Sequence, residues 1–73
     1  MMKTRQEEIE TELRKLLAQK EALEKELKEL YEEYERTKLN NLKRVLLSWI
    51  KPKEVRLSMI EAQIAELKKL LEG

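Results

Sequence analysis

Residues 9–34 read IETELRKLLAQKEALEKELKELYEEY, and this stretch decides the fold. Apolar side chains recur in it at spacings that alternate between four and three residues. This heptad spacing is typical of a coiled-coil helix, which packs along one narrow stripe. The a positions are Leu13, Lys20, Leu27 and Tyr34, and the d positions are Ile9, Leu16, Leu23 and Leu30.

Lys20 is the charged residue in this stripe. A lysine at an a position penalises registers that would bury it more deeply, and its long side chain can carry the charge out to solvent. We therefore interpret Lys20 as a determinant of register in a small oligomer. The competing interpretation is a reactive amine, but no helper group lies near Lys20 in the sequence.

The beginning of the first helix is marked by Thr4 and Glu7, which lie three residues apart. This is the spacing of a capping box, in which the two side chains satisfy free amide groups of the first helical turn. Further glutamates follow directly, where the positive end of the helix dipole favours negative charge. The helix is therefore predicted to begin near Lys3.

The apolar stripe changes phase after Tyr34. Leu42, Val45 and Trp49 nevertheless continue its face on a helix of 3.6 residues per turn. We therefore predict one uninterrupted helix over residues 3–50. At about 1.5 Å per residue, this helix would be about 72 Å long.

Lys51-Pro52-Lys53-Glu54 is the strongest break signal in the chain. A proline costs about 3 kcal/mol inside a helix but is favoured at the first helical position. We therefore predict a turn near Pro52 and a second helix over residues 53–72. The apolar stripe of this second helix consists of Leu57, Ile60, Ile64, Leu67 and Leu71.

A second candidate turn lies at Asn40-Asn41, because asparagine tolerates left-handed backbone geometry and suits a helix cap. A turn there would produce two helices of nearly equal length, with Pro52 as a kink in the second. The two breaks can also coexist, with residues 42–50 as a short middle helix. The sequence favours the turn near Pro52 and leaves the other turn open.

The predicted architecture is an all-α, coiled-coil helical hairpin that forms one unit over residues 1–73. Its core is predicted to contain Tyr34, Leu42, Leu46, Trp49, Leu57, Ile60, Ile64, Leu67 and Leu71. The rest of the long helix is an arm with an apolar stripe and no partner in its own chain, so we expect a homo-oligomer, with a dimer favoured. The oligomer interface is predicted to contain Ile9, Leu13, Leu16, Lys20, Leu23, Leu27 and Leu30.

Composition narrows the chemistry that the chain can perform. Its 73 residues include no histidine and no cysteine, so the usual zinc ligands, a disulfide and the commonest general base are missing. The single glycine excludes a phosphate-binding loop. We therefore expect no enzyme activity, no metal, no cofactor and no small-molecule substrate. The predicted function is that of a structural or oligomerisation protein.

Positive charge is concentrated in the middle of the chain. Residues 36–56 contain seven basic residues and one acidic residue, a net charge of +6, whereas residues 1–35 carry a net charge of −4. A basic amphipathic helix can bind nucleic-acid phosphates or an anionic membrane surface. The residues predicted for such a binding module are Lys43, Arg44, Lys51, Lys53 and Arg56. The competing interpretation is that they pair with the acidic arm of another chain.

No stretch approaches the roughly 20 apolar residues of a membrane-spanning helix, and the first residues lack the apolar segment of a signal peptide. A cytoplasmic location is the resulting expectation. The regular glutamate and lysine faces would suit a thermophilic protein or a designed scaffold. Asn40-Asn41, the phase change and Trp49 are less regular than an idealised design.

Overall fold

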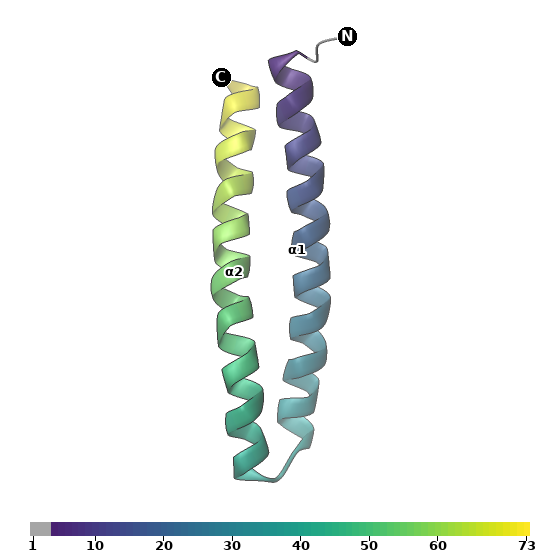
Figure 1. The fold of residues 1–73 in the computed structure, drawn as a ribbon, viewed down its shortest axis with the longest axis vertical. Coiled ribbons are helices and arrows are strands. Elements are labelled where there is room, and N and C mark those ends of the chain that lie inside the picture. The colour runs from purple at the N-terminus through teal and green to yellow at the C-terminus, as the bar shows by residue number, and fades with distance from the viewer. Residues whose placement is uncertain (1–3) are drawn as a thin grey trace.

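The computed structural model describes residues 4–73 and contains two α-helices that pack side by side as a hairpin (Figure 1). Helix α1 spans Arg5–Arg36 and helix α2 spans Asn40–Glu72, and the described range contains no strand. The helices are antiparallel, so α1 begins and α2 ends at the same end of the molecule. The hairpin is long and thin, with extents of 56 × 20 × 14 Å.

Thr4 caps the first turn of α1, as the sequence predicts, but the Glu7 carboxylate bonds the Thr4 hydroxyl and not the free amide group that a capping box predicts. The Thr4 hydroxyl accepts a hydrogen bond from the Glu7 N–H at 3.2 Å and donates one to the Glu7 carboxylate at 3.2 Å. These bonds satisfy a free amide group and fix the acidic side chain near the positive end of the helix dipole. Helix α1 begins at Arg5, and the predicted beginning near Lys3 lies outside the described residues.

The chain reverses direction over Thr37-Lys38-Leu39. The Thr37 N–H closes α1 by donating to the Glu33 carbonyl at 3.0 Å, and the Leu39 N–H donates to the Thr37 hydroxyl at 3.3 Å. A threonine hydroxyl that accepts from a following amide is a usual stabiliser of a short turn. Both Thr37 and Leu39 have extended backbone conformations, which point the chain away from the axis of α1.

This turn corrects the predicted topology. The helix predicted over residues 3–50 ends at Arg36, and the chain does not turn near Pro52. The second candidate, a turn at Asn40-Asn41, is nearly right and correctly implied two helices of similar length. The asparagines themselves are the first two residues of α2, however, and no residue of the described range has a left-handed backbone conformation.

Pro52 is exposed and lies inside α2. Its ring removes one backbone hydrogen bond, which costs about 3 kcal/mol in a helix interior. Continuing the helix keeps Ile50 and Leu57, on either side of the proline, on the face that packs against α1. Burying an aliphatic side chain contributes about 1.5–3 kcal/mol. The free energy gained by burying the several apolar residues beyond the proline is therefore larger than the cost of the proline inside the helix.

The core lies along the contact between the helices and forms two adjoining clusters of buried side chains. The terminal cluster consists of Leu16, Leu23, Ile60 and Ile64, with Leu13, Leu57 and Leu67 packed against it. The turn cluster consists of Leu27, Leu46 and Ile50, with Leu30, Tyr34 and Leu57 packed against it. Leu57 contacts both clusters, so one apolar seam joins them.

Three residues that were predicted for the hairpin core lie outside it. Leu42, Trp49 and Leu71 are exposed, by 43%, 53% and 37% respectively. Ile50, which was not predicted for the core, is only 1% exposed. The position of the turn explains why Ile50 is buried in place of Trp49. It sets which side of α2 faces α1, and Ile50 lies on that side. Trp49 precedes that residue and points about 100° away around the helix.

The predicted arm of α1 has partners within its own chain, contrary to expectation. Leu16, Leu23 and Leu27 are buried against α2. The neighbouring Leu13 and Leu30 are partly buried against the same clusters. Association between intact hairpins therefore has to use a surface other than this stripe.

The position of Pro52 inside α2 predicts that Pro52→Ala stabilises the protein. Alanine restores the lost hydrogen bond, and the gain is partly offset by the greater freedom of the unfolded chain, so we expect an increase of about 2 kcal/mol in the free energy of unfolding. Urea denaturation followed by circular dichroism measures it. Gln63→Ala, at an exposed site of the same helix, is the control and is expected to change stability by less than about 0.5 kcal/mol. A loss of stability in Pro52→Ala would contradict the interior position, since a proline at a helix start is favourable.

Candidate interaction surface

The two helices carry opposite net charges. Helix α1 contains seven basic and eleven acidic residues, a net charge of −4, and α2 contains seven basic and four acidic residues, a net charge of +3. Interspersed opposite charges attract neighbouring helices and penalise arrangements that bring like charges together. The acidic helix α1 and the helix that carries most of the basic segment therefore pack side by side within one chain.

Two lysines lie in the stripes through which the helices pack. Lys53 Nζ is 2.7 Å from Glu26 Oε2, and Lys20 Nζ is 3.7 Å from Glu61 Oε2. Both lysine side chains are about one third exposed (35% and 32%), because their stems cover the stripe while their charged ends reach its edges. Ion pairs of this exposure contribute at most about 1 kcal/mol. The role of Lys20 in setting the register stays a prediction, and Lys53 becomes a second candidate for it.

Both tyrosines of the chain contact side chains of α2. The Tyr31 hydroxyl donates a hydrogen bond to the Glu54 carboxylate. This hydrogen bond, with smaller contributions from desolvation and from the negative charge of Glu54, raises the pKa of Tyr31 above its ordinary value of 10.0. The ammonium group of Lys43 lies 5.2 Å from the ring centroid of Tyr34, within the range of a cation–π interaction.

The five residues predicted to bind anions do not form one patch. Lys53 is paired with Glu26, and Lys43 lies over the ring of Tyr34. Arg44, Lys51 and Arg56 are exposed. Arg44 and Lys51 lie seven residues apart, two helical turns, on the side of α2 that is turned away from α1. Arg56 points to a different side of α2. Of the five residues, only Arg44 and Lys51 therefore lie on the same surface.

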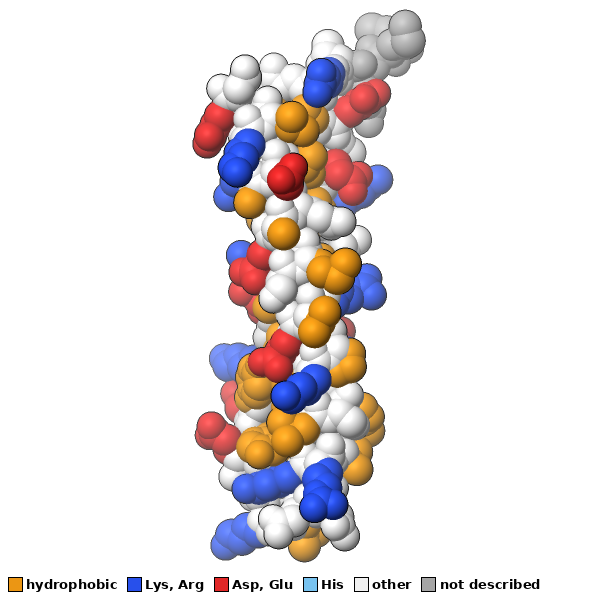
Figure 2. All heavy atoms as spheres, turned by 90° about the vertical axis from the view of Figure 1, so that its left-hand side faces the viewer, with side chains coloured by type: hydrophobic (Ala, Val, Ile, Leu, Met, Phe, Trp, Pro, Cys, Tyr) orange, Lys and Arg blue, Asp and Glu red, His pale blue; other side chains and the backbone are white. Residues whose placement is uncertain are grey.

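Exposed apolar side chains gather on α2 rather than on α1. Figure 2 looks onto α2 and shows hydrophobic side chains along this helix, with basic side chains among them near the turn. Helix α1 contributes only Leu17 and Tyr31 to the large apolar side chains that are exposed in the described range. Those on α2 are Leu42, Val45, Leu47, Trp49, Val55, Met59, Leu70 and Leu71.

Part of this apolar surface is a regular stripe. Successive members are three or four residues apart, all are exposed, and the spacing is that of a second helix-packing face. The outer stripe, as we call it, consists of the apolar Leu42, Val45, Trp49, Pro52 and Met59 and of the charged Arg56, which lies between Pro52 and Met59. Trp49 is the neighbour of the buried Ile50, so the outer stripe points roughly at a right angle to the direction of α1.

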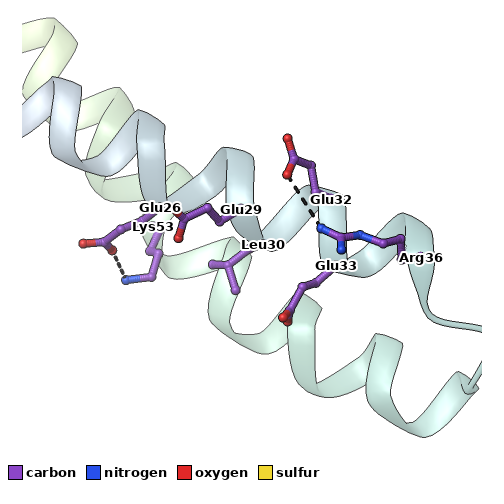
Figure 3. Close-up of a pocket in the computed structure, with 7 residues that line it drawn as sticks. All are labelled: Glu26, Glu29, Leu30, Glu32, Glu33, Arg36 and Lys53. Carbon is purple, nitrogen blue, oxygen red and sulfur yellow. Dashed lines mark hydrogen bonds and ion pairs between the residues drawn. The ribbon is translucent and has the colours of Figure 1, made fainter.

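A groove between the helices borders the outer stripe. It is lined by Gln19, Ala22, Leu23 and Glu26 of α1 and by Pro52, Lys53 and Arg56 of α2. A second hollow continues it toward the turn and is lined by Glu26, Glu29, Leu30, Glu32, Glu33, Arg36 and Lys53 (Figure 3). Glu26 pairs with Lys53, and Glu32 lies 3.8 Å from the guanidinium of Arg36. Among the described residues, Glu29 and Glu33 form no ion pair, so the α1 wall of the groove is acidic.

The structure offers no sign of a metal centre or of a membrane span in the part that it describes. No group of three carboxylates within residues 4–73 is arranged to hold a metal ion. Neither α1 nor α2 has a segment apolar and long enough to cross a bilayer. Comparison of the sequence and the fold with protein-family models, with curated proteins and with solved structures gave no match. The function therefore has to be inferred from the chain's own geometry.

The contact between Tyr31 and Glu54 predicts a pH-dependent contribution to stability. Because the pKa of Tyr31 is raised in the folded state, the contact stabilises the protein below about pH 10, and this contribution is lost as the pH rises through the raised pKa. Absorbance titration of a Tyr34→Phe background observes Tyr31 alone. Adding Glu54→Gln is expected to lower the pKa of Tyr31, whereas adding Glu66→Gln, elsewhere on α2, should leave it unchanged. The same pKa in both variants would mean that the contact is not formed in solution.

Proposed function

We propose that this chain is a structural protein whose function is to self-associate through coiled-coil packing, and that it catalyses no reaction. The proposal rests mainly on the exposed apolar side chains, most of which lie on one helix, α2. Scattered exposed apolar residues are normal in a monomer, but a regular apolar face on one element is typical of a surface that packs against a partner.

The shape of the hairpin supports association. Its accessible surface is 6275 Å², whereas a compact monomer of 8.8 kDa would expose about 4,800 Å². The radius of gyration is 16.8 Å, against about 11 Å for a compact domain of this length. Two helices can cover only one side of each other, so a large part of the surface of each helix stays exposed and is accessible to a partner.

The spacing of the buried residues supports coiled-coil packing. Leu16, Leu23 and Leu27 on α1 are separated by seven and four residues. Leu46, Ile50, Ile60 and Ile64 on α2 fit the same alternation of four and three, with Lys53 and Leu57 at the intervening positions. A repeat of this kind keeps one narrow stripe of each helix against its neighbour over many turns.

Self-association predicts a solution mass above the 8.8 kDa of one chain. Sedimentation equilibrium over a roughly 100-fold range of concentration is the measurement, because mass action makes the distribution of species depend on concentration. We expect a dimer or larger assembly at the upper end of the range. A mass of one chain throughout would refute the proposed function.

A second candidate function is binding to an anionic partner, such as nucleic acid or a charged surface, through the basic segment 36–56. The observation in its favour is that Arg44 and Lys51 are exposed on one side of α2, next to the exposed Val55. The acidic residues of α1 near the turn reduce the net charge of the same end, and this makes the candidate the weaker one.

Binding to an anionic partner predicts affinity that falls steeply as salt is added, because phosphate contacts release counterions. Fluorescence anisotropy with labelled DNA and RNA at about 50 and 150 mM salt tests it. Changing Arg44 and Lys51 to Gln should abolish the binding. Changing Lys68 and Lys69 to Gln removes the same charge from the other end of α2 and should have little effect. No binding at the lower salt, or equal losses in both variants, would exclude this candidate.

A further inference from the structure

We infer that copies of this chain associate head to tail. The groove of one copy, which we call the acidic groove, holds the basic face on the other side of α2 of the next copy. This inference rests on the proposed self-association and specifies its two surfaces and its symmetry. Because the two surfaces lie on different sides of the hairpin, the contact repeats from copy to copy and builds an open chain instead of a closed dimer.

The basic face lies on the side of α2 that is turned away from α1. Its members are three or four residues apart and all exposed, and they are Arg44, Leu47, Lys51 and Val55. At about 100° per residue, Arg44 and Lys51 lie roughly 140° and 160° around the helix from Trp49 of the outer stripe. Neither base forms an ion pair within the described range. Glu54, the acid beside them, accepts a hydrogen bond from Tyr31 of α1. The basic face is therefore free to contact a neighbouring molecule.

The acidic groove has an apolar wall on α2. Pro52 and Arg56 line the groove from this helix. Trp49 lies on the same side of α2, because seven residues, two helical turns, separate it from Arg56. The Trp49 side chain is 53% exposed, and an exposed tryptophan is the kind of residue that dominates binding when a partner covers it. This wall therefore favours a partner that brings apolar surface to it.

The opposite wall of the groove, on α1, carries negative charge that the hairpin does not neutralise. Near the turn this acidic wall contains four glutamates and one arginine. Glu26 and Glu32 are paired with bases of the same hairpin. Glu29 and Glu33 form no ion pair within residues 4–73 (Figure 3). A helix that occupies the groove must therefore present basic side chains to this wall.

The basic face of a second copy supplies both kinds of contact. Arg44 and Lys51 are seven residues apart, about 10 Å along α2. The glutamates of the acidic wall extend over the same distance, from Glu26 to Glu33. A docked α2 can therefore bring both bases to the wall together. Their aliphatic stems, and the exposed leucine and valine beside them, cover apolar surface. A basic group that passes over Trp49 also gains a cation–π interaction.

The separation of the two surfaces decides the symmetry of the assembly. A two-fold axis brings identical surfaces together, so it would place one acidic groove against another or one basic face against another. The repulsion of like charges opposes both arrangements. A head-to-tail contact pairs unlike surfaces and leaves one acidic groove and one basic face free at the ends, where further copies can add. The assembly therefore has no fixed number of chains.

Complementation between two variants tests the head-to-tail contact. The groove variant carries Glu29→Lys and Glu33→Lys, which make the acidic wall basic and leave the basic face unchanged. The face variant carries Arg44→Gln and Lys51→Gln, which remove the charge of the basic face and leave the groove unchanged. All four side chains are exposed, so both variants are expected to retain the helical circular dichroism of the parent chain.

Sedimentation equilibrium measures the masses. We expect the parent to form larger assemblies as its concentration rises, and each variant alone to remain a single chain. An equal mixture of the two variants should form dimers with one chain of each kind and nothing larger, because one intact groove meets one intact basic face. Lys68→Gln with Lys69→Gln, which removes the same charge from the other end of α2, is the control and is expected to assemble like the parent.

The single tryptophan of the chain reports which groove is occupied. With Trp49→Phe added to the groove variant, the tryptophan emission of the mixture comes from the face variant alone. It should shift to shorter wavelength as the groove of the face variant is covered. With Trp49→Phe added to the face variant instead, the emission should not shift. Shifts in both mixtures, or in neither, would contradict the head-to-tail contact.

The masses separate this inference from the proposed function. A mixture that stays as single chains, or a face variant that associates as the parent does, would overturn the inference. A parent chain whose mass stops at that of two chains would also overturn it and would leave the proposed self-association intact. A parent that remains a single chain at every concentration would overturn both proposals together.

Discussion

The contact between the apolar stripes of α1 and α2 is the constraint on which the rest of the structure depends. The ion pairs that also join the helices are partly exposed and contribute at most about 1 kcal/mol each, and the chain has no cysteine for a disulfide. The seven buried side chains of the two helices are all leucine or isoleucine and all lie along this seam. The turn, the capping of α1 and the tolerance of Pro52 follow from the need to keep the seam continuous. The proline is accepted because a break there would divide the seam of α2 between two shorter helices.

Much of this fold could be predicted from local sequence patterns. The all-helical class and the cap at Thr4 depend on spacings within a few residues and are confirmed. The turn was misplaced because proline is a strong local signal, whereas the competing signal is distributed along the chain. Leu46, Ile50, Leu57 and Ile60 keep the same alternating spacing across Pro52, and this continuity indicates an unbroken helix. The phase change after Tyr34, which the prediction treated as tolerable, marks the end of α1.

The candidate surface was harder to predict, because it depends on which side of α2 faces α1. A difference of one residue in the face that α2 turns toward α1 puts Ile50 in the core and leaves Trp49 exposed. Both residues were recognised as apolar, but the sequence did not show which of them is buried. Lys53 illustrates the same point. In the sequence it belongs to a basic cluster, but in the structure it occupies the seam and is paired with Glu26. Whether Lys53 binds a partner or packs in the seam depends on how α1 and α2 are aligned. A local sequence pattern does not contain this information.

The hairpin also has a mechanical consequence, which follows from the placement of its two helix ends. Helix α1 begins and α2 ends at the same end of the molecule, and the turn lies at the other end (Figure 1). Polypeptide joined to either helix end would therefore leave from one pole. A pulling force applied between the beginning of α1 and the end of α2 would separate the two helices progressively. The layers of side chains nearest these two helix ends would separate first. The layers around Leu46 and Ile50, next to the turn, would be the last to separate.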